Sequence, residues 1–250
     1  MPQLSEAGSE THLEIVRQWL QDCDGHRDCA RQQNRTRDGR NPARTPTRLI
    51  DVGTKGDQFI YLREENIDAN AEWVALSHQW GTPPYFSTET SNIDKRKSGI
   101  HLEELPNTFR DAVTVTRALN HRYLWIDSIC IVQGSGGDFH SESKRMEDVY
   151  SGAYCVLAAS CASGHSSGFL QRRKERDFVT VHPRGTHVPV YICESIDNFK
   201  DHVLNGALNR RGWVLQEHAL ARRTIFFTEY QTYFECGRGV RCETMTKMSK

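Results

Sequence analysis

Residues 123–133 read Tyr123-Leu124-Trp125-Ile126-Asp127-Ser128-Ile129-Cys130-Ile131-Val132-Gln133, a nearly continuous apolar run with a single carboxylate near its centre. The glycine-rich residues 134–137 follow, and this pattern is typical of a strand buried on both faces of a parallel sheet. A charged aspartate inside such a strand is costly unless it is paired, hydrogen-bonded or at an open strand end. Two interpretations of Asp127 stay open. It either accepts hydrogen bonds from the next loop, or belongs to a site at the carboxyl end of the strand, where open α/β sheets bind ligands.

Similar buried segments occur on both sides of this run, with helical segments between them. Residues 72–81 and 155–160 predict two further buried strands. Helices are expected from Leu105, with an apolar face that reaches Leu119, and from Phe139 to Tyr154 with Asp138 as N-cap. This alternation of strands and helices predicts an α/β domain with a parallel sheet and right-handed crossovers.

Shorter β elements are expected near both ends of the chain. Residues 48–62 and 224–236 read as hairpins, and residues 178–194 alternate like an antiparallel pair. Residues 10–21 carry apolar side chains at helical spacing. The arginine-rich stretch from 31 to 47 lacks interleaved aromatic residues, so it reads as a solvated loop and not as a nucleic-acid patch.

The composition excludes several classes of protein. The 250 residues suit a single α/β domain, and the formal net charge of zero gives no field that attracts nucleic acid or an anionic membrane. The longest apolar run is too short and too charged to span a bilayer, and the first residues do not resemble a secretory signal. We therefore expect a cytoplasmic protein with no membrane span, no nucleic-acid partner and reduced thiols.

Two cysteines and a histidine lie close together after the first predicted helix. Cys23, His26 and Cys29 have a spacing that invites zinc, but a structural zinc site needs four ligands. No second CxxC or HxxxH lies nearby, so the pattern favours a loop with buried thiols, and no metal site is assigned.

Several motifs, taken in order, resemble those of the fungal heterokaryon-incompatibility (HET) domain. Residues that precede the domain in that family are also similar here, namely Trp19-Leu20, Cys23, His26, Cys29 and Pro46–Asp51. The resemblance therefore covers most of the chain. The motifs are Ala75-Leu76-Ser77-His78-Gln79-Trp80-Gly81, Leu105-Pro106 with Phe109-Arg110-Asp111-Ala112, Tyr123–Ile131, Met146 with Tyr150 and Ala153, and Arg211-Gly212-Trp213 with Gln216-Glu217.

The resemblance implies a fold, a division of the chain and a biological role. HET domains act in fungal self/non-self recognition and trigger programmed cell death, and they are distantly similar to Toll/interleukin-1-receptor (TIR) domains. The expected fold is accordingly a flavodoxin-like, TIR-like parallel sheet flanked by helices, with additional antiparallel β elements at both ends. The expected division is an N-terminal helix and polar loop (1–47), a HET domain (48–240, with its core at 72–220) and a C-terminal tail (241–250).

Some TIR domains cleave NAD with a glutamate on a helix that follows a buried strand, so the resemblance also suggests a reaction. Nicotinamide leaves as a neutral molecule, and the ribosyl cation needs a carboxylate nearby. Glu142 is the candidate, because it lies in the first turn of the helix after the Asp127 strand, and Glu147 is the second choice. A glutamate at that position is also what a helix N-terminus favours for structural reasons alone. Asp127 would orient a neighbour or contact the ribose.

The end of the preceding strand supplies candidate substrate-binding residues. Ser77, His78, Trp80 and Gly81 leave the sheet at the same expected edge, and Trp80 could stack on a ring of the substrate. Each of these side chains alone is more often used for packing. A Ser–His–Asp hydrolase is rejected because adjacent residues on a strand face opposite sides and no GxSxG motif is present. Cys130 lies in an apolar run that disfavours the thiolate, so it is rejected as a nucleophile.

Three functional hypotheses follow. The first is a TIR-like NAD(P) glycohydrolase that releases nicotinamide, with NAD as substrate and no bound cofactor. The second is a non-catalytic signalling module that acts through homotypic contacts, and the third is an enzyme for another small molecule on the same fold. We expect a homo-oligomer, and a partner protein of the incompatibility reaction is a further candidate.

Overall fold

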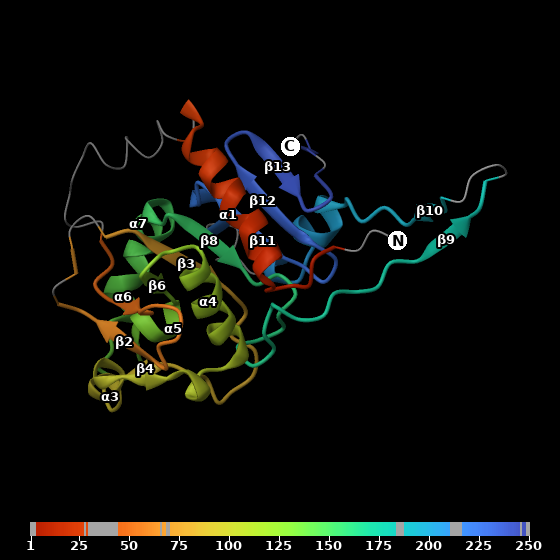
Figure 1. Cartoon of the computed structure of the whole chain (residues 1–250). Helices are drawn as coiled ribbons and strands as arrows, with labels where there is room; N and C mark the ends of the chain where they lie inside the picture. Colours follow the sequence, from red (N-terminus) through yellow and green to blue (C-terminus); the bar gives the residue numbers. More distant parts are fainter. Residues whose placement is uncertain are drawn as a thin grey trace.

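The structure is a computed structural model of the chain (Figure 1). It describes residues 4–27, 29, 45–65, 67–68, 71–183, 188–210, 217–245 and 247–248.

A ten-stranded mixed sheet forms the centre of the molecule, in the order β14-β13-β12-β11-β8-β3-β6-β1-β2-β5. Its middle consists of four mutually parallel strands, namely β6 (Tyr123–Trp125), β3 (Trp73–Ser77), β8 (Cys155–Ala158) and β11 (Thr224–Phe227). Numbered along the chain, these strands lie in the order 2-1-3-4, which is the order of doubly wound flavodoxin-like sheets. The predicted α/β fold with a parallel sheet is confirmed.

Antiparallel strands extend the sheet on both sides, as expected. Strands β1 (Leu49–Asp51), β2 (Phe59–Arg63) and β5 (Ile100–His101) continue it beyond β6. Beyond β11 lie β12 (Thr232–Cys236), β13 (Gly239–Cys242) and β14 (Lys247–Met248). Strands β3 and β8 are buried throughout because the sheet is covered on both faces.

Helices cover the two faces of this sheet. Helices α1 (Glu10–Asp24) and α4 (Asn107–Ala118) contact one another, with α1 lying across β12 in Figure 1. Helix α7 (Met146–Gly152) packs on the other face, where the ring of Tyr150 meets Trp125 edge-on at 5.6 Å. The crossover from β3 to β6 contains α4, and the crossover from β6 back past β3 to β8 contains α7. The two crossovers run in opposite directions across the sheet, so right-handedness places their helices on opposite faces. The short helix α3 (Ile93–Ser98) contacts β2.

The stretch 123–133 departs from its prediction as one strand. It forms the short strand β6, then a helical turn, α5 (Asp127–Cys130), and then β7 (Val132–Gln133), which pairs with β4 (Thr88–Glu89). Residues 124–126 and 128–132 are buried because the turn packs into the core, so burial on both sides of Asp127 did not require a continuous strand. As a result, Asp127 lies immediately after the carboxyl end of β6.

The predicted helix from Phe139 to Tyr154 is interrupted. It consists of α6 (Phe139–Glu142), a 3₁₀ turn (Ser143–Arg145) and α7. Asp138 precedes α6 but does not cap it with its side chain. The two oxygens of Asp138 accept instead from the backbone N–H of Val132 at 2.8 Å and from Arg48 at 2.7 Å, so the carboxylate fastens the preceding loop.

Strands β9 (Phe178–Val181) and β10 (Val190–Cys193) confirm the antiparallel pair expected in residues 178–194. They form a separate two-stranded sheet that extends away from the body of the molecule in Figure 1. Among the residues that the structure describes, no helix is both long and apolar enough to cross a membrane.

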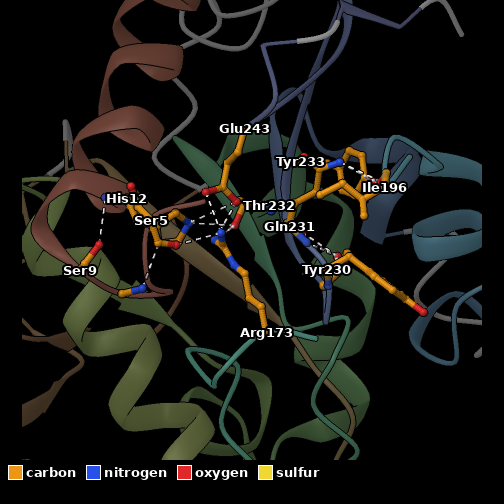
Figure 2. A network of polar contacts seen from close by, with 12 residues as sticks. Ser5, Ser9, His12, Arg173, Ile196, Tyr230, Gln231, Thr232, Tyr233 and Glu243 are labelled. Carbon is orange, nitrogen blue, oxygen red and sulfur yellow. Dashed lines mark hydrogen bonds and ion pairs between the residues drawn. The ribbon is translucent and has the colours of Figure 1, made fainter. Parts of the chain in front are cut away.

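A buried polar network joins the two ends of the described chain (Figure 2). Arg173 bonds to both oxygens of Glu243, at 2.9 and 2.6 Å, and to the carbonyl of Ser5. On α1, His12 contacts the hydroxyl of Thr232 at 2.8 Å through Nε2. Its Nδ1 accepts from the backbone N–H of Gly8, so Nε2 carries the proton and the ring is neutral.

Candidate functional site at the carboxyl edge of the sheet

The four parallel strands end at one edge of the sheet. The chain leaves β3 towards β6 on one side, whereas β8 lies on the other side of β3, so the strand order reverses at β3. Ligands of open α/β sheets bind at such a reversal, beyond the carboxyl ends of the strands. The residues that follow β3 and β6 therefore define the candidate site.

Asp127 lies at this edge and accepts hydrogen bonds from two groups. Its Oδ2 accepts from the indole N–H of Trp80 at 2.8 Å, and its Oδ1 accepts from the backbone N–H of Ser128 at 2.7 Å. The Nδ1 atom of His78 lies 3.8 Å from Oδ1. The first interpretation of Asp127 is met, because it accepts a hydrogen bond from a backbone N–H of the following turn. Asp127 also lies beside Trp80 and His78, two of the residues predicted to bind a substrate.

Ser77 and His78 face opposite sides of the sheet, as the alternation of strand side chains requires. His78 points to the side of α4, where its ring meets Phe109 edge-on at 5.0 Å. Ser77 points to the other side and donates to Oε2 of Glu217 at 2.5 Å. Both residues of the pair are buried. Two carboxylates, Asp127 and Glu217, thus reach the end of β3 from opposite faces.

Sequence reasoning did not select Glu217 as a site residue. It belongs to the connection between β8 and β11, within the helical residues 217–220. Its place in the Gln216-Glu217 motif could have pointed to a site residue, but the motif was used only as evidence for the family resemblance. Residues 211–216 of that motif lie outside the described residues.

Glu142 is placed differently from the expectation that it faces Asp127. It is buried at the end of α6, and its Oε1 accepts from the hydroxyl of Thr47 at 2.7 Å. The guanidinium of Arg145 lies 3.5 Å from the same oxygen. The partners of Glu142 are not those of Asp127, so the two carboxylates belong to separate groups of polar contacts. Glu147, the second choice, is exposed.

Gly81 has a structural reason to be glycine. Its φ angle is +78°, and a Cβ atom on it would lie 2.9 Å from the Cα of Gly164. The same loop is held by His165, whose Nδ1 lies 2.6 Å from the carbonyl oxygen of Trp80. The segment after β3 is therefore fixed against the segment after β8, across the position where the strand order reverses.

Two cavities are described, and they lie at opposite edges of the sheet. One, of about 510 Å³, adjoins the carboxyl ends of β8 and β11 and is lined by Ser160, Lys174, His202 and Tyr230 among others. The larger, of about 1080 Å³, lies between α1, α4 and the β1–β2 hairpin. Neither lining includes Ser77, His78, Trp80, Asp127 or Glu142.

Four arginines line the larger cavity, and each has a polar partner. Arg122 bonds to Asp51, which also lies 3.5 Å from Arg63, while Arg117 bonds to the carbonyl of Val52 and Arg17 to that of Ala118. Of these two cavities, the smaller lies at the same edge as the candidate site, because it adjoins the carboxyl ends of β8 and β11.

A family model described as "Heterokaryon incompatibility protein (HET)" matches residues 73–217, which is more than half of the chain. The match begins at the first residue of β3 and ends at Glu217, so it spans the whole candidate site. No curated protein and no solved structure matches the chain at significant similarity.

Proposed function

Because the chain belongs to the heterokaryon incompatibility family, we propose that it acts in fungal self/non-self recognition by cleaving NAD(P) to release nicotinamide. The family match supports the role in heterokaryon incompatibility. The reaction is our proposal, and one observation carries it. Two carboxylates, Asp127 and Glu217, come from different crossovers to the end of β3 at the carboxyl edge of a doubly wound sheet.

The chemistry requires little besides a positioned carboxylate. When the nicotinamide–ribose bond breaks, the bonding electrons leave with nicotinamide, and positive charge develops on the ribose. A carboxylate beside the ribose stabilises that charge and orients the attacking water. We assign this role to Glu217, because it is helical, lies in the connection that follows the parallel strand β8, and reaches the reversal of strand order through its bond to Ser77.

Three further residues have roles in this proposal. Asp127 holds the indole of Trp80, which offers a face for stacking a ring of the substrate. His78 lies beside Asp127 at the same edge of the sheet, with 3.8 Å between its Nδ1 and Oδ1 of Asp127. Glu142 remains the alternative carboxylate, and the experiment below distinguishes it from Glu217.

The test is nicotinamide release from NAD and NADP by the full chain, at several protein concentrations. We expect Glu217→Gln and Asp127→Asn to lower turnover by about 100-fold or more, the size of effect seen when one charge-stabilising group is removed. Glu103→Gln, on an exposed carboxylate, is the matched control and should leave turnover unchanged.

The variants also separate the alternatives. Loss of turnover in Glu142→Gln, with Glu217→Gln unaffected and both proteins folded by circular dichroism, would move the reacting centre to α6. Absence of nicotinamide release by the wild-type chain at every concentration would reject the enzymatic proposal.

A second candidate function, a homotypic signalling module, is favoured by the β9–β10 hairpin. Val179 pairs with Ile192 and Val181 with Val190, so all four side chains share one face, and each is between 40% and 63% exposed. A contiguous exposed apolar face on a two-stranded sheet is typical of an interaction surface.

A homotypic signalling module requires that the chain associates with a second copy of itself. Sedimentation velocity of the wild-type chain and of the double variant Val179→Lys/Ile192→Glu tests it. Self-association that is lost in the variant supports the module, and equal sedimentation of a monomeric wild type and variant contradicts it.

A further inference from the structure

Three thiols and one imidazole converge at the amino edge of the sheet, opposite the candidate site. Cys23 belongs to the last turn of α1, His26 and Cys29 follow it, and Cys236 ends β12. The four potential ligand atoms all lie within 4.8 Å of one another, and all four residues are buried. The fourth ligand that the local sequence lacked is thus supplied by a residue more than 200 positions away.

The spacing of these atoms suits a tetrahedral metal ion. The Nδ1 atom of His26 lies 3.8 Å from the sulfur of Cys29 and 3.9 Å from the sulfur of Cys236. In a zinc site with Zn–S bonds of about 2.3 Å and a Zn–N bond of about 2.0–2.1 Å, the nitrogen and each sulfur are about 3.6 Å apart. The observed distances are therefore only slightly longer than the edges of a zinc tetrahedron.

The surroundings of Cys236 also suit a bound thiolate. The backbone N–H of Arg238 donates to its sulfur, and a hydrogen bond of this kind orients a metal ligand. Gly237 lies beside the cluster, because a Cβ atom there would be 3.4 Å from the sulfur of Cys29. Arg223, which bonds to Asp24 at 2.6 Å, lies near Cys23 and offsets negative charge from the thiolates.

The donor set selects the metal. Three thiolates with one imidazole in a tetrahedral arrangement favour Zn²⁺ over Mg²⁺ or Ca²⁺, which require oxygen ligands. All four positions are occupied by protein groups, so no site is left for water or substrate, and the role is structural.

We propose that Cys23, His26, Cys29 and Cys236 bind one Zn²⁺ ion in a closed tetrahedral site that fastens α1 to the end of β12. The site joins the N-terminal helix to the C-terminal strands, which also meet through the contact of His12 with Thr232, the ion pair of Asp22 with Arg241, and the stacked rings of Trp19 and Phe234. Because the unfolded chain has no preformed site, the free energy of zinc binding contributes directly to folding.

The experiment is elemental analysis of the purified full chain after exhaustive dialysis against metal-free buffer. We expect one zinc per chain in the wild type and in Cys155→Ala, a matched control that removes a buried thiol of β8 outside the cluster. Cys236→Ser and Cys23→Ser should reduce the zinc content at least tenfold. A metal-free wild type, or zinc retained in full by Cys236→Ser, would overturn the proposal.

A second measurement keeps the test independent of whether the cysteine variants fold. The wild-type chain is prepared with Co²⁺ in place of zinc, and its visible spectrum is recorded. Tetrahedral cobalt with three thiolates gives intense d–d bands and a thiolate-to-cobalt charge-transfer band. A spectrum with only the weak bands of six-coordinate cobalt would contradict a closed Cys₃His site.

Discussion

The hydroxyl of Ser77 donates to Oε2 of Glu217 across 2.5 Å and joins two residues that are 140 positions apart in the sequence. The pair ties the end of the central strand β3 to the connection between β8 and β11. Because both residues are buried, the bond is shielded from water and is expected to matter for stability as well as for the position of the carboxylate.

Ser77→Ala removes a donor from this buried carboxylate. A hydrogen bond to a charged group contributes about 1.5–3 kcal/mol, so we expect the free energy of unfolding to fall by that amount in urea denaturation. Ser141→Ala is the control, because its hydroxyl bonds to the carbonyl of Asp138 at an exposed position. Equal stability of the two variants would show that Glu217 does not depend on Ser77.

Gly81→Ala and Gly134→Ala separate backbone strain from steric contact. Both glycines have φ of +78°, but only Gly81 faces a neighbour, the Cα of Gly164, whereas nothing lies within 4 Å of the position at Gly134. The positive φ costs each variant roughly 1–2 kcal/mol. We expect Gly81→Ala to lose at least about 1 kcal/mol more, because the two loops must move apart. Urea denaturation of both variants measures the difference.

Arg48→Met tests the buried ion pair that holds the loop before α6. Arg48 bonds to Asp138 at 2.7 Å, to Glu64 at 3.0 Å and to the carbonyl of Cys130 at 3.1 Å. Loss of these charged contacts should cost about 3 kcal/mol. The exposed pair of Lys95 and Glu104 gives the contrast, since Lys95→Met should cost less than about 1 kcal/mol. Similar losses in both variants would mean that burial does not strengthen the Arg48 contacts.

The stability of the protein should depend on pH through His12. Burial, followed by the nearby charge of Arg173, lowers the pKa of His12 to about 3. Between pH 6.5 and 3 the unfolded chain therefore binds a proton that the folded chain does not, and stability falls as the pH falls, by up to about 1.4 kcal/mol per pH unit. His12→Gln should have a flatter profile over this interval in denaturation at a series of pH values.

One neighbouring group opposes this dependence. Burial raises the pKa of Glu243, so the folded chain takes up that proton more readily than the unfolded chain does, and stability rises as the pH falls. Glu243 is present in both proteins, so the difference between the wild-type and His12→Gln profiles isolates His12. Parallel profiles would contradict a neutral, buried His12.

Much of the architecture followed from local pattern. The buried segments 72–81 and 155–160 gave β3 and β8, and the apolar face from Leu105 to Leu119 gave α4. These predictions succeeded because strand and helix periodicities report directly on which side chains are buried. The stretch 123–133 was predicted as one strand and was wrong in its second half, because a buried helical turn and a buried strand have the same apolar composition.

The site was predictable only in part, for a related reason. Residues on one segment, Ser77 to Gly81, could be placed together at a strand end, and Asp127 was recognised as an unusual charge in an apolar run. Which carboxylates meet there depends on the crossovers. Glu142 contacts Thr47 and Arg145 instead of the end of β3. Glu217, which lies in the connection between β8 and β11, bonds to Ser77 at that end.

The sequence by itself determined the alternation of strands and helices, the ordered motifs of the HET family, and the formal net charge of zero. Tertiary structure alone decided which distant residues meet. Glu217 bonds to Ser77, and Glu243 bonds to Arg173. Cys236 lies beside Cys23, His26 and Cys29. The physical reason is that periodicity reports the burial of each residue, while contacts between distant segments depend on the order and direction in which the strands assemble.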